Sequence, residues 1–267
     1  MKKFLKRLAS YLESPSRTPT GEPDFLFLKH LYAYLFIQQF VHKKIVLDIG
    51  CGKGYGSFVL SKKAKETYAL DLQKERVIYV HEKYGSKIVF LVADASFLPF
   101  KDKEFDIIAS LQVIEHVPDL KKYLFEIHRI LKEGGKFILT TPNRKIRLKS
   151  GEKPWNPDHL REFDFTELHS ILKRYFDDVK LYGLHGSSEI LTREKNRIHR
   201  IRLSLKLFPY KIRHFTPVFV KKLMDKVLST ILNIKQKRVQ TSMIRIDDYK
   251  IRTSVASCLD FIAICSR

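Results

Sequence analysis

Apolar and polar positions alternate between residues 44 and 142 in a way that predicts five short buried strands separated by helices. The strand candidates are compact apolar runs bounded by charged residues or glycine: 45–49, 67–70, 88–93, 105–110 and 136–141. The stretches between them have helical spacing at 55–64, 73–84 and 119–132. Strands that alternate with helices of this length are typical of parallel βαβ units. We therefore predict an α/β fold with a doubly wound sheet.

The segments on either side of this region follow a different order. Residues 2–13 and 24–41 have helical spacing, and a proline-rich linker separates them. After the fifth strand, residues 166–175 predict a helix, 179–184 a sixth strand and 259–265 a last strand. The sheet is therefore expected to have seven strands and to be mostly parallel.

The long segment between the last two predicted strands is the least regular part of the chain. It has helical spacing from Val220 to Ile234, whereas residues 201–207 fit a strand as well as a helix. We predict three regions: N-terminal helices at 1–43 that cap the substrate side, a core of 44–184 with 257–267, and a basic, mostly helical insertion or lid at 185–256.

The net charge of +21 is concentrated in this insertion. Residues 185–256 contain 17 Lys and Arg against 5 Asp and Glu, whereas residues 44–184 contain 25 against 20. A concentrated basic surface attracts anions such as nucleic acid or acidic lipid headgroups. A solvated basic face that only maintains solubility has the same composition. Peripheral contact with an anionic membrane through residues 190–250 is thus one expected use, with nucleic acid as the less favoured partner.

Cysteine content and the apolar runs favour a cytoplasmic protein. The three cysteines, Cys51, Cys258 and Cys265, form no CxxC pair, which argues against a disulfide framework and against structural zinc. Residues 1–14 lack the continuous apolar core of a secretory signal, and polar residues interrupt 24–41. We expect a cytoplasmic location, with peripheral association at the inner membrane face as the alternative.

Glycines and acidic residues gather where the first three predicted strands end. Gly50, Gly52 and Gly54 follow the first strand, and glycines allow a sharp turn whose backbone comes close to a ligand. Asp71 ends the second strand and Asp94 the third. Ligands of open parallel sheets bind at the carboxyl ends of the strands, where an acidic residue can accept hydrogen bonds from ribose hydroxyls. The combination predicts an adenosine-containing cofactor.

These motifs resemble those of the class I S-adenosylmethionine-dependent methyltransferases, in particular the type 11-like group with quinone-pathway and small-molecule enzymes. The resemblance rests on LDIGCGKG (Leu47 to Gly54), on Asp71, and on the later stretches Val92–Asp119, Glu126–Asn143 and His159–Leu172. It implies a Rossmann-like methyltransferase fold, methyltransferase activity and S-adenosyl-L-methionine as the cofactor. The resemblance and the strand ends assign these residues to cofactor binding: Asp48, Gly50, Cys51, Gly52, Gly54, Asp71, Leu72, Asp94, Ala95, Leu111 and Gln112.

Methyl transfer requires alignment of the reactants and often a base that removes a proton from the acceptor. Glu115 and His116, after the fourth strand, and His159, further along, are the candidates; they can also be residues that only line the site. Some quinone-pathway relatives have Glu-x-x-Glu-His here and hold magnesium with it. Gln112 stands in place of the first carboxylate, and hard cations prefer carboxylate oxygens, so we predict no metal site.

Three functions stay open at this stage. The favoured one is methyl transfer, at oxygen, to a small-molecule, lipid-linked or glycan-type acceptor, with the insertion as a lid. The second is an RNA methyltransferase that grips RNA with the insertion. The segment after the fourth strand reads SLQVIEHV, without an Asn-Pro-Pro-aromatic signature, and no cysteine lies near strands four and five, which weighs against this alternative. The third is a non-catalytic binding protein that retains the cofactor fold.

Overall fold

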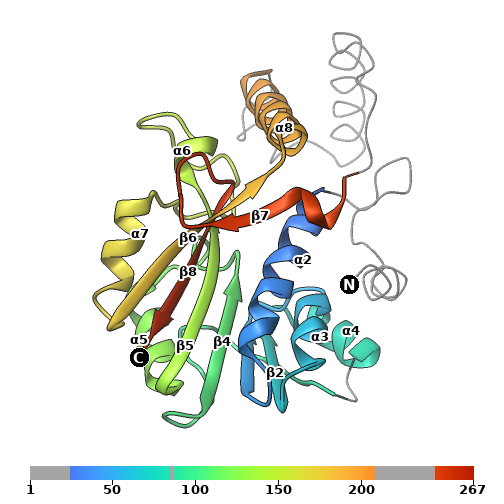
Figure 1. The fold of residues 1–267 in the computed structure, drawn as a ribbon, viewed down its shortest axis with the longest axis vertical. Helices are drawn as coiled ribbons and strands as arrows, with labels where there is room; N and C mark the ends of the chain where they lie inside the picture. The colour runs from blue at the N-terminus through green and yellow to red at the C-terminus, as the bar shows by residue number, and fades with distance from the viewer. Residues whose placement is uncertain (1–24, 85–86, 208–243) are drawn as a thin grey trace. The chain divides into compact units, whose positions relative to one another are not determined.

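The computed structural model describes residues 25–84, 87–207 and 244–267 (Figure 1). The predicted first helix, the linker and the helix from Val220 to Ile234 lie outside these residues. The chain divides into two compact units, one of residues 1–186 with 245–267 and one of residues 187–244. Residues 245–256 therefore belong to the unit that contains the sheet, whereas we had assigned them to the insertion.

Eight strands form one sheet in the order β3-β2-β1-β4-β5-β8-β6-β7. Their bounds are β1 (Ile45–Ile49), β2 (Glu66–Asp71), β3 (Val89–Val92), β4 (Phe105–Leu111), β5 (Leu131–Pro142), β6 (Asp178–Gly186), β7 (Tyr249–Arg252) and β8 (Asp260–Ser266). Strands β1 to β5 pair in parallel, and β8 lies antiparallel between β5 and β6. The predicted mostly parallel, doubly wound sheet is confirmed.

The sequence predicted seven strands, and β7 is the one strand of the described sheet that it did not predict. It pairs antiparallel with the end of β6, with Tyr249 opposite Gly186, at one edge of the sheet. Only four residues long, it contains Lys250 and Arg252. Short, charged strands are common at sheet edges because they discourage pairing with other chains, and they carry little apolar alternation. The apolar pattern of the sequence therefore gave no signal for it.

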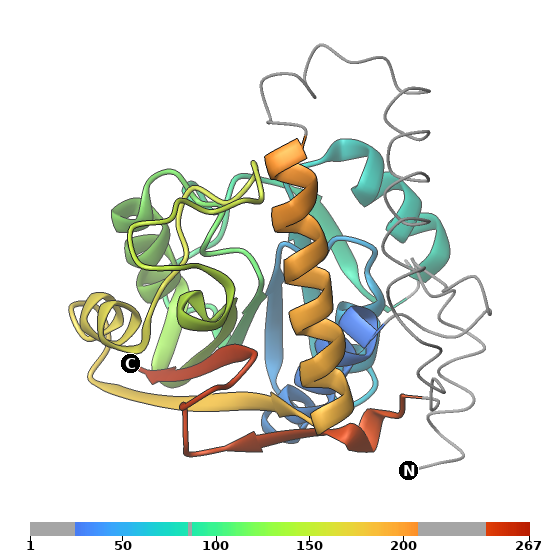
Figure 2. The ribbon, with the colours of Figure 1, turned by 90° about the horizontal axis from the view of Figure 1, so that it is seen from above.

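Helices cover both faces of the sheet. They are α2 (Phe25–Ile37), α3 (Tyr55–Ser61), α4 (Lys74–Tyr84), α5 (Leu120–Ile130), α6 (Arg144–Arg147) and α7 (Phe165–Leu172), with short 3-10 helices η1 (Gln38–Phe40) and η2 (Ile246–Asp248). Figures 1 and 2 show α2, α3 and α4 on one side of the sheet and α5 and α7 on the other. Among the described residues no helix combines the length and apolar character needed to cross a bilayer.

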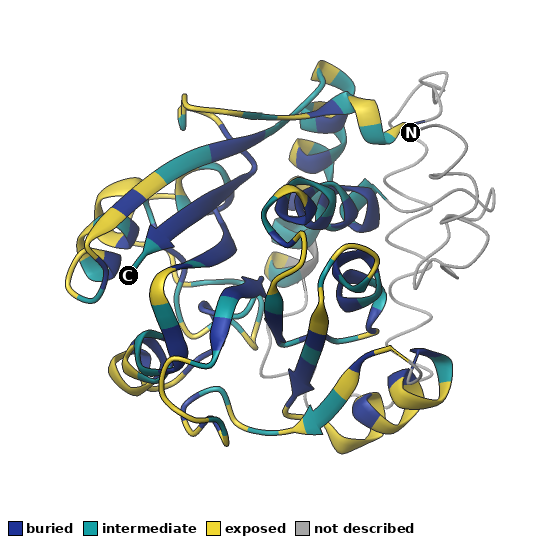
Figure 3. Cartoon of the chain, turned by 60° about the horizontal axis from the view of Figure 1, so that its bottom comes forward, coloured by how far each residue is buried: buried dark blue, intermediate teal, exposed yellow. Residues whose placement is uncertain are grey.

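The core is built where the two faces of the strands meet these helices, and Figure 3 shows the central strands as mostly buried. Leu70 of β2 and Ile108 of β4 belong to the same buried cluster as Ile127 of α5. On the opposite face, Ala69 packs in a separate cluster with Val80 of α4. Consecutive residues of one strand thus point to opposite faces, as the pleat requires. The apolar runs of the sequence reflect burial on both sides.

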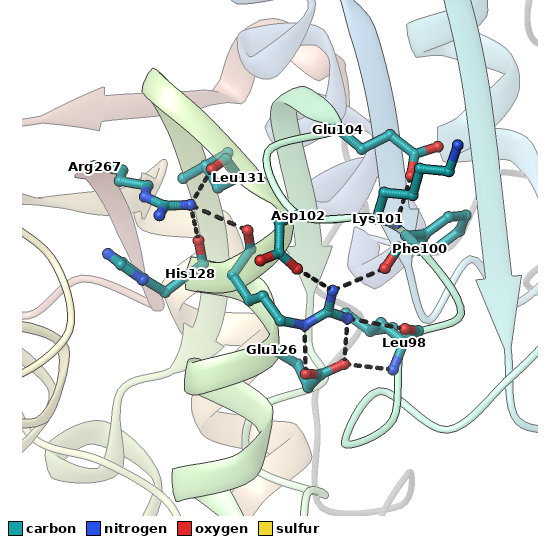
Figure 4. A network of polar contacts seen from close by, with 10 residues as sticks. Leu98, Phe100, Lys101, Asp102, Glu104, Glu126, His128, Leu131 and Arg267 are labelled. Atoms are coloured by element: carbon teal, nitrogen blue, oxygen red, sulfur yellow. Dashed lines mark hydrogen bonds and ion pairs between the residues drawn. The ribbon is translucent and has the colours of Figure 1, made fainter.

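A polar network lies at the C-terminal end of α5, near the residues where β4 and β5 begin (Figure 4). Arg129 binds the Glu126 carboxylate with two nitrogens at 2.8 Å and donates to the carbonyl oxygens of Leu98 and Phe100. Arg267 donates to three carbonyls at the end of the helix, those of His128, Arg129 and Leu131. The network satisfies helix carbonyls that have no partner within the helix.

In the second unit the structure describes one helix, α8 (Ser188–Leu207). The segment 201–207, for which the sequence left strand and helix open, is helical. Arg193 pairs with Glu189, and Arg197 with Glu194, one turn apart along this helix. These pairs stabilise a helix by a few tenths of a kcal/mol each, about 0.3–0.5.

Candidate cofactor and acceptor site

The glycine turn after β1 has the backbone shape of a ligand cradle. Gly50, Gly52 and Gly54 have φ angles of +72°, +54° and +72°, a region that favours glycine. A Cβ on Gly50 would lie 2.4 Å from Val113, so the side of this glycine is filled. A Cβ on Gly52 would meet no atom within 4 Å. The turn is therefore packed at one glycine and open at the next, which leaves room for a bound group at Gly52.

Asp71, at the end of β2, holds this turn in place. One carboxylate oxygen accepts a hydrogen bond from the Gly52 amide at 3.0 Å, and the other accepts one from the Gln73 amide at 3.0 Å. Arg76 lies 3.7 Å from the same carboxylate. Each carboxylate oxygen has a second lone pair that can accept a ribose hydroxyl. The structure thus brings Asp71 together with the glycine turn, as the sequence had indicated.

Asp48 lies fully buried beneath the turn, at the end of β1. Its carboxylate accepts hydrogen bonds from Ser57 Oγ at 2.6 Å and from the Tyr34 hydroxyl at 3.1 Å. Burial raises its pKa from 3.8 to about 7, although both hydroxyls act in the opposite direction. Tyr34 reaches the site from α2, and its ring fills the space beside Gly56, where a Cβ would lie 2.0 Å from Cζ. Sequence reasoning missed both hydroxyl partners.

Most of the remaining predicted cofactor residues lie just after the carboxyl ends of strands β1, β2 and β3. Asp94 begins the turn after β3, where its side chain accepts from the Ser96 amide at 2.8 Å, and Ala95 lies beside it. Leu72, after β2, has 69% of its surface exposed, which is unusual for a leucine next to a buried strand. Cys51 is buried inside the turn, and burial raises the pKa of its thiol well above the usual range. It has the environment of a packed residue and not that of a reactive thiolate.

Gln112 follows Leu111, the last residue of β4. Its φ of +57° is uncommon for a residue other than glycine. Its amide nitrogen donates to Thr140 Oγ1 at 3.1 Å and to Asp260 Oδ2 at 3.2 Å. Asp260 also forms a buried ion pair with Lys29 of α2 at 2.7 Å. Sequence reasoning missed this pair; the only signal was a lysine inside an apolar helix.

Glu115, His116 and His159 are brought together, although His159 is 43 positions beyond His116. Glu115 is fully buried; one oxygen accepts from Thr141 Oγ1 at 3.1 Å, and the other has no hydrogen-bond partner among the described residues. Burial raises the pKa of Glu115 to about 8 and lowers that of His116. The two imidazole rings lie edge to face, with their centroids 4.7 Å apart.

Hydrogen bonds fix both imidazoles. His116 Nδ1 lies 2.7 Å from the carbonyl oxygen of Asp158, and His159 Nδ1 lies 2.8 Å from Glu162 Oε1. Arg147 Nη2 lies 3.1 Å from the same oxygen of Glu162. A carbonyl and a carboxylate are acceptors, so each Nδ1 carries the hydrogen and each neutral ring has its lone pair on Nε2. From the sequence, Glu162 is a candidate of the same rank as His159 for the mouth at which the acceptor enters.

The strand order, the glycine turn and the acidic strand ends have the arrangement of a parallel α/β fold that binds its ligand at the strand ends, as class I S-adenosylmethionine-dependent methyltransferases do. Comparison with known proteins agrees. Residues 47–139 match a protein family described as a methyltransferase domain. In this region the chain is similar to proteins named S-adenosylmethionine-dependent methyltransferases, and solved methyltransferase structures share its fold.

Curated relatives carry more specific names. Over 179 residues the chain is 33% identical to a "probable S-adenosylmethionine-dependent methyltransferase" of Mycobacterium tuberculosis, with 63% of this chain and 65% of that protein aligned. It is 30% identical to a malonyl-[acyl-carrier protein] O-methyltransferase of Hamiltonella defensa, over 53% of this chain and 56% of that protein. A fatty-acid O-methyltransferase of Mycolicibacterium smegmatis is also 30% identical, over 53% of each. The chain thus spans less than two thirds of the length of these relatives.

Solved structures show the same fold at low sequence identity. A methyltransferase of Thermotoga maritima, described as a "possible histamine N-methyltransferase", aligns with a TM-score of 0.56 at 18% identity. The alignment covers 90% of this chain and 91% of that chain. Identity at this level supports the fold and gives no information on the acceptor.

Proposed function

We propose that this chain transfers a methyl group from S-adenosyl-L-methionine to an oxygen of a small-molecule or lipid-linked acceptor. The observation that carries the proposal is the glycine turn, in which Asp71 holds the Gly52 amide while the position of a Cβ on Gly52 stays open. Oxygen as the target is supported by two relatives whose names are O-methyltransferases. The donor supplies an electrophilic methyl group on a sulfonium; the residues of the chain bind, align and move a proton.

The binding roles follow from charge and position. Asp71 would accept the ribose hydroxyls, and Asp94 with Ala95 would meet the adenine edge. Leu72 would be covered by the cofactor, which accounts for its exposed side chain. Asp48, with Gly50, Cys51 and Gly54 around it, would face the positively charged end of the donor, because a buried carboxyl favours a nearby cation. Leu111 and Gln112 would close the far side of the site.

The groups after β4 would serve the acceptor. Nucleophilic attack by a hydroxyl oxygen forms the O–CH3 bond and breaks the S–CH3 bond, whose electron pair stays on sulfur. The hydroxyl proton must then go to a base. The Nε2 lone pairs of His116 and His159 are available for it, and Glu162 would stabilise the imidazolium of His159 through its Nδ1 hydrogen bond. Glu115 would line the acceptor side.

Calorimetry with S-adenosyl-L-methionine tests the cofactor half of the proposal. One molecule per chain should bind to the full-length protein, and Asp71→Asn should weaken binding at least tenfold, while Glu152→Gln, an exposed surface change, should not. Absence of binding would contradict the whole proposal and favour a non-catalytic protein with this fold. Mass spectrometry of methylated products from a panel of fatty acids, acyl-carrier-protein thioesters and phenols then tests oxygen as the target.

We also propose that the basic segment predicted as a lid contacts anionic lipid. On α8, Lys195 and Arg200 are exposed and available for headgroups. Each basic residue near an anionic surface contributes about 1 kcal/mol. In a co-sedimentation assay with phosphatidylglycerol vesicles, the double variant Lys195→Gln/Arg200→Gln should bind at least several-fold more weakly than the parent chain. Equal sedimentation of both proteins would contradict membrane contact through this helix.

A further inference from the structure

Beside the cofactor turn, three side chains have the chemistry of a transition-metal site. Glu115, His116 and His159 each offer one ligand atom, and these atoms lie within 4.8 Å of one another. A tetrahedral ion with bonds of about 2.1 Å has ligands about 3.4 Å apart. Side-chain adjustments of little more than an ångström would therefore bring all three to one ion.

The buried carboxylate gives the first independent reason to expect an ion. Glu115 is fully buried, and its Oε1 has no hydrogen-bond partner in the described part of the chain. A buried polar atom without a partner is unfavourable and calls for an explanation such as an ion or a water. Thr141 Oγ1 holds the other oxygen at 3.1 Å, so the carboxylate is already oriented. A cation bound to Glu115 Oε1 would give this oxygen the partner that it lacks.

The hydrogen bonds behind the two imidazoles give the second reason. Histidines that bind metals almost always donate their other ring N–H to a carboxylate or a backbone carbonyl, which fixes the ring and the tautomer. His159 donates to Glu162, and His116 donates to the Asp158 carbonyl. Both Nε2 atoms are left as ligands. Both neighbouring histidines have such a hydrogen bond behind the ring. Packing of two rings edge to face does not require these hydrogen bonds.

The supporting segments are joined by the main chain. The Leu160 amide donates to the Glu115 carbonyl oxygen at 2.9 Å, so the loop that carries His159 is fixed to the turn that carries Glu115 and His116. Arg147 lies against Glu162, 3.1 Å away, and supports the carboxylate behind His159. Three ligands come from two segments whose relative position is set by these contacts. The site is prepared before an ion arrives.

We propose that Glu115, His116 and His159 bind one divalent transition-metal ion, such as Zn²⁺, Fe²⁺ or Co²⁺. Two imidazoles and one carboxylate suit these ions, whereas Mg²⁺ prefers oxygen ligands in an octahedral shell. Gln112 takes no part, because its amide is directed to Thr140 and Asp260. The expectation of no metal, which rested on Gln112 in place of a carboxylate, did not include His159 as a ligand.

Three protein ligands leave a coordination position open, as in catalytic metal sites. An acceptor oxygen in that position would lose its proton more readily, because a metal ion lowers the pKa of a bound hydroxyl. The ion would then replace an imidazole as the group that prepares the acceptor. This role rests on the proposed methyl transfer, whereas the binding of the ion does not.

The test uses the full chain after removal of metals with EDTA and dialysis. Titration with Co²⁺ should produce visible ligand-field absorption that saturates at one ion per chain, and Zn²⁺ should displace it. Millimolar Mg²⁺ should leave the spectrum unchanged. His159→Phe keeps an aromatic ring against His116 and removes a ligand; Glu115→Gln keeps the shape of the carboxylate. Each should weaken Zn²⁺ binding at least 100-fold in competition with a chromophoric chelator.

Two further variants make the result specific. Glu162→Gln should weaken Zn²⁺ binding by about 10–100-fold, because it removes the carboxylate behind His159 and leaves the three ligands in place. His169→Gln, on α7, should bind Zn²⁺ like the parent chain. Circular dichroism and S-adenosyl-L-methionine calorimetry without metal show whether each variant is folded. If Co²⁺ gives no saturable band, if His159→Phe binds Zn²⁺ as tightly as the parent, or if Mg²⁺ competes equally, the proposed site is wrong. Donor binding without metal binding would leave the proposed methyl transfer standing.

Discussion

Replacement of the buried carboxyl of Asp48 should change how stability depends on pH. In the folded chain its pKa is about 7, against an ordinary value of 3.8. Between pH 4 and pH 7 the folded state keeps a proton that the unfolded state has released. The free energy of unfolding contributed by Asp48 therefore falls as pH rises through this window and is constant above it. Asp48→Asn cannot ionise, so this fall should be absent in the variant.

The size of the effect follows from the shift. A pKa difference of about 3 units corresponds to about 4 kcal/mol, which is an upper bound because buried groups relax. About 3 kcal/mol of this accumulates between pH 4.5 and pH 7.5, so the variant should gain up to that amount over the parent chain across this range. An Asn oxygen in the place of Asp48 Oδ2 can accept from both the Ser57 hydroxyl, at 2.6 Å, and the Tyr34 hydroxyl, at 3.3 Å, so the local geometry should be retained.

Urea unfolding at four pH values, followed by circular dichroism and by the fluorescence of the single tryptophan, measures the difference directly. Glu115 also has a raised pKa, but it is present in both proteins and cancels in the comparison. If the unfolding free energies of the two proteins run parallel from pH 4.5 to pH 7.5, the buried carboxyl is ionised throughout and the reasoning fails.

Three further predictions concern the packing around the site. Gly56→Ala should lower the unfolding free energy by about 1–3 kcal/mol in thermal denaturation, because the new Cβ would overlap the Tyr34 ring; an unchanged melting temperature would contradict this close packing. Lys29→Met should lower the free energy of unfolding, measured in urea, by about 3–5 kcal/mol, because it leaves Asp260 charged and buried. The double variant Lys29→Met/Asp260→Asn should recover most of the loss. An equal loss in the double variant would contradict a compensating pair. Asp71→Ala should weaken S-adenosyl-L-methionine at least tenfold by calorimetry and lower the melting temperature as well, since the Gly52 amide loses its acceptor; unchanged donor affinity would remove Asp71 from the cofactor site.

The sequence predicted the features that depend on neighbouring residues. Five parallel strands, the glycine turn and the acidic strand ends follow from local apolar runs and from the geometry of βα units. Features that depend on distant residues were not visible. Tyr34 of helix α2 reaches Asp48 of strand β1, and Lys29 pairs with Asp260 across 231 positions. Without a local pattern, apolar periodicity contains no information on such partners.

At the site after β4, the sequence indicates the residues but not their contacts with one another. Glu115 and His116 were identified as candidates from their place after a strand, and His159 as a separate one. Only the fold reveals that the three share one location and that Asp158 and Glu162 hold both rings. The chemistry that these residues can perform together thus depends on hydrogen bonds made by a loop, which the sequence pattern does not show.

Strand β8 occupies a place between β5 and β6 that has a consequence for the synthesis of the chain. Residues 260–266 emerge from the ribosome after both neighbours, so β5 has a bare edge until they arrive. At about 5–20 residues per second this interval lasts on the order of ten seconds. During that time the nascent sheet presents an unpaired apolar strand, which is a site for misassembly and for chaperone binding. Completion of the sheet is therefore tied to residues 260–266, which are translated after both of their neighbours.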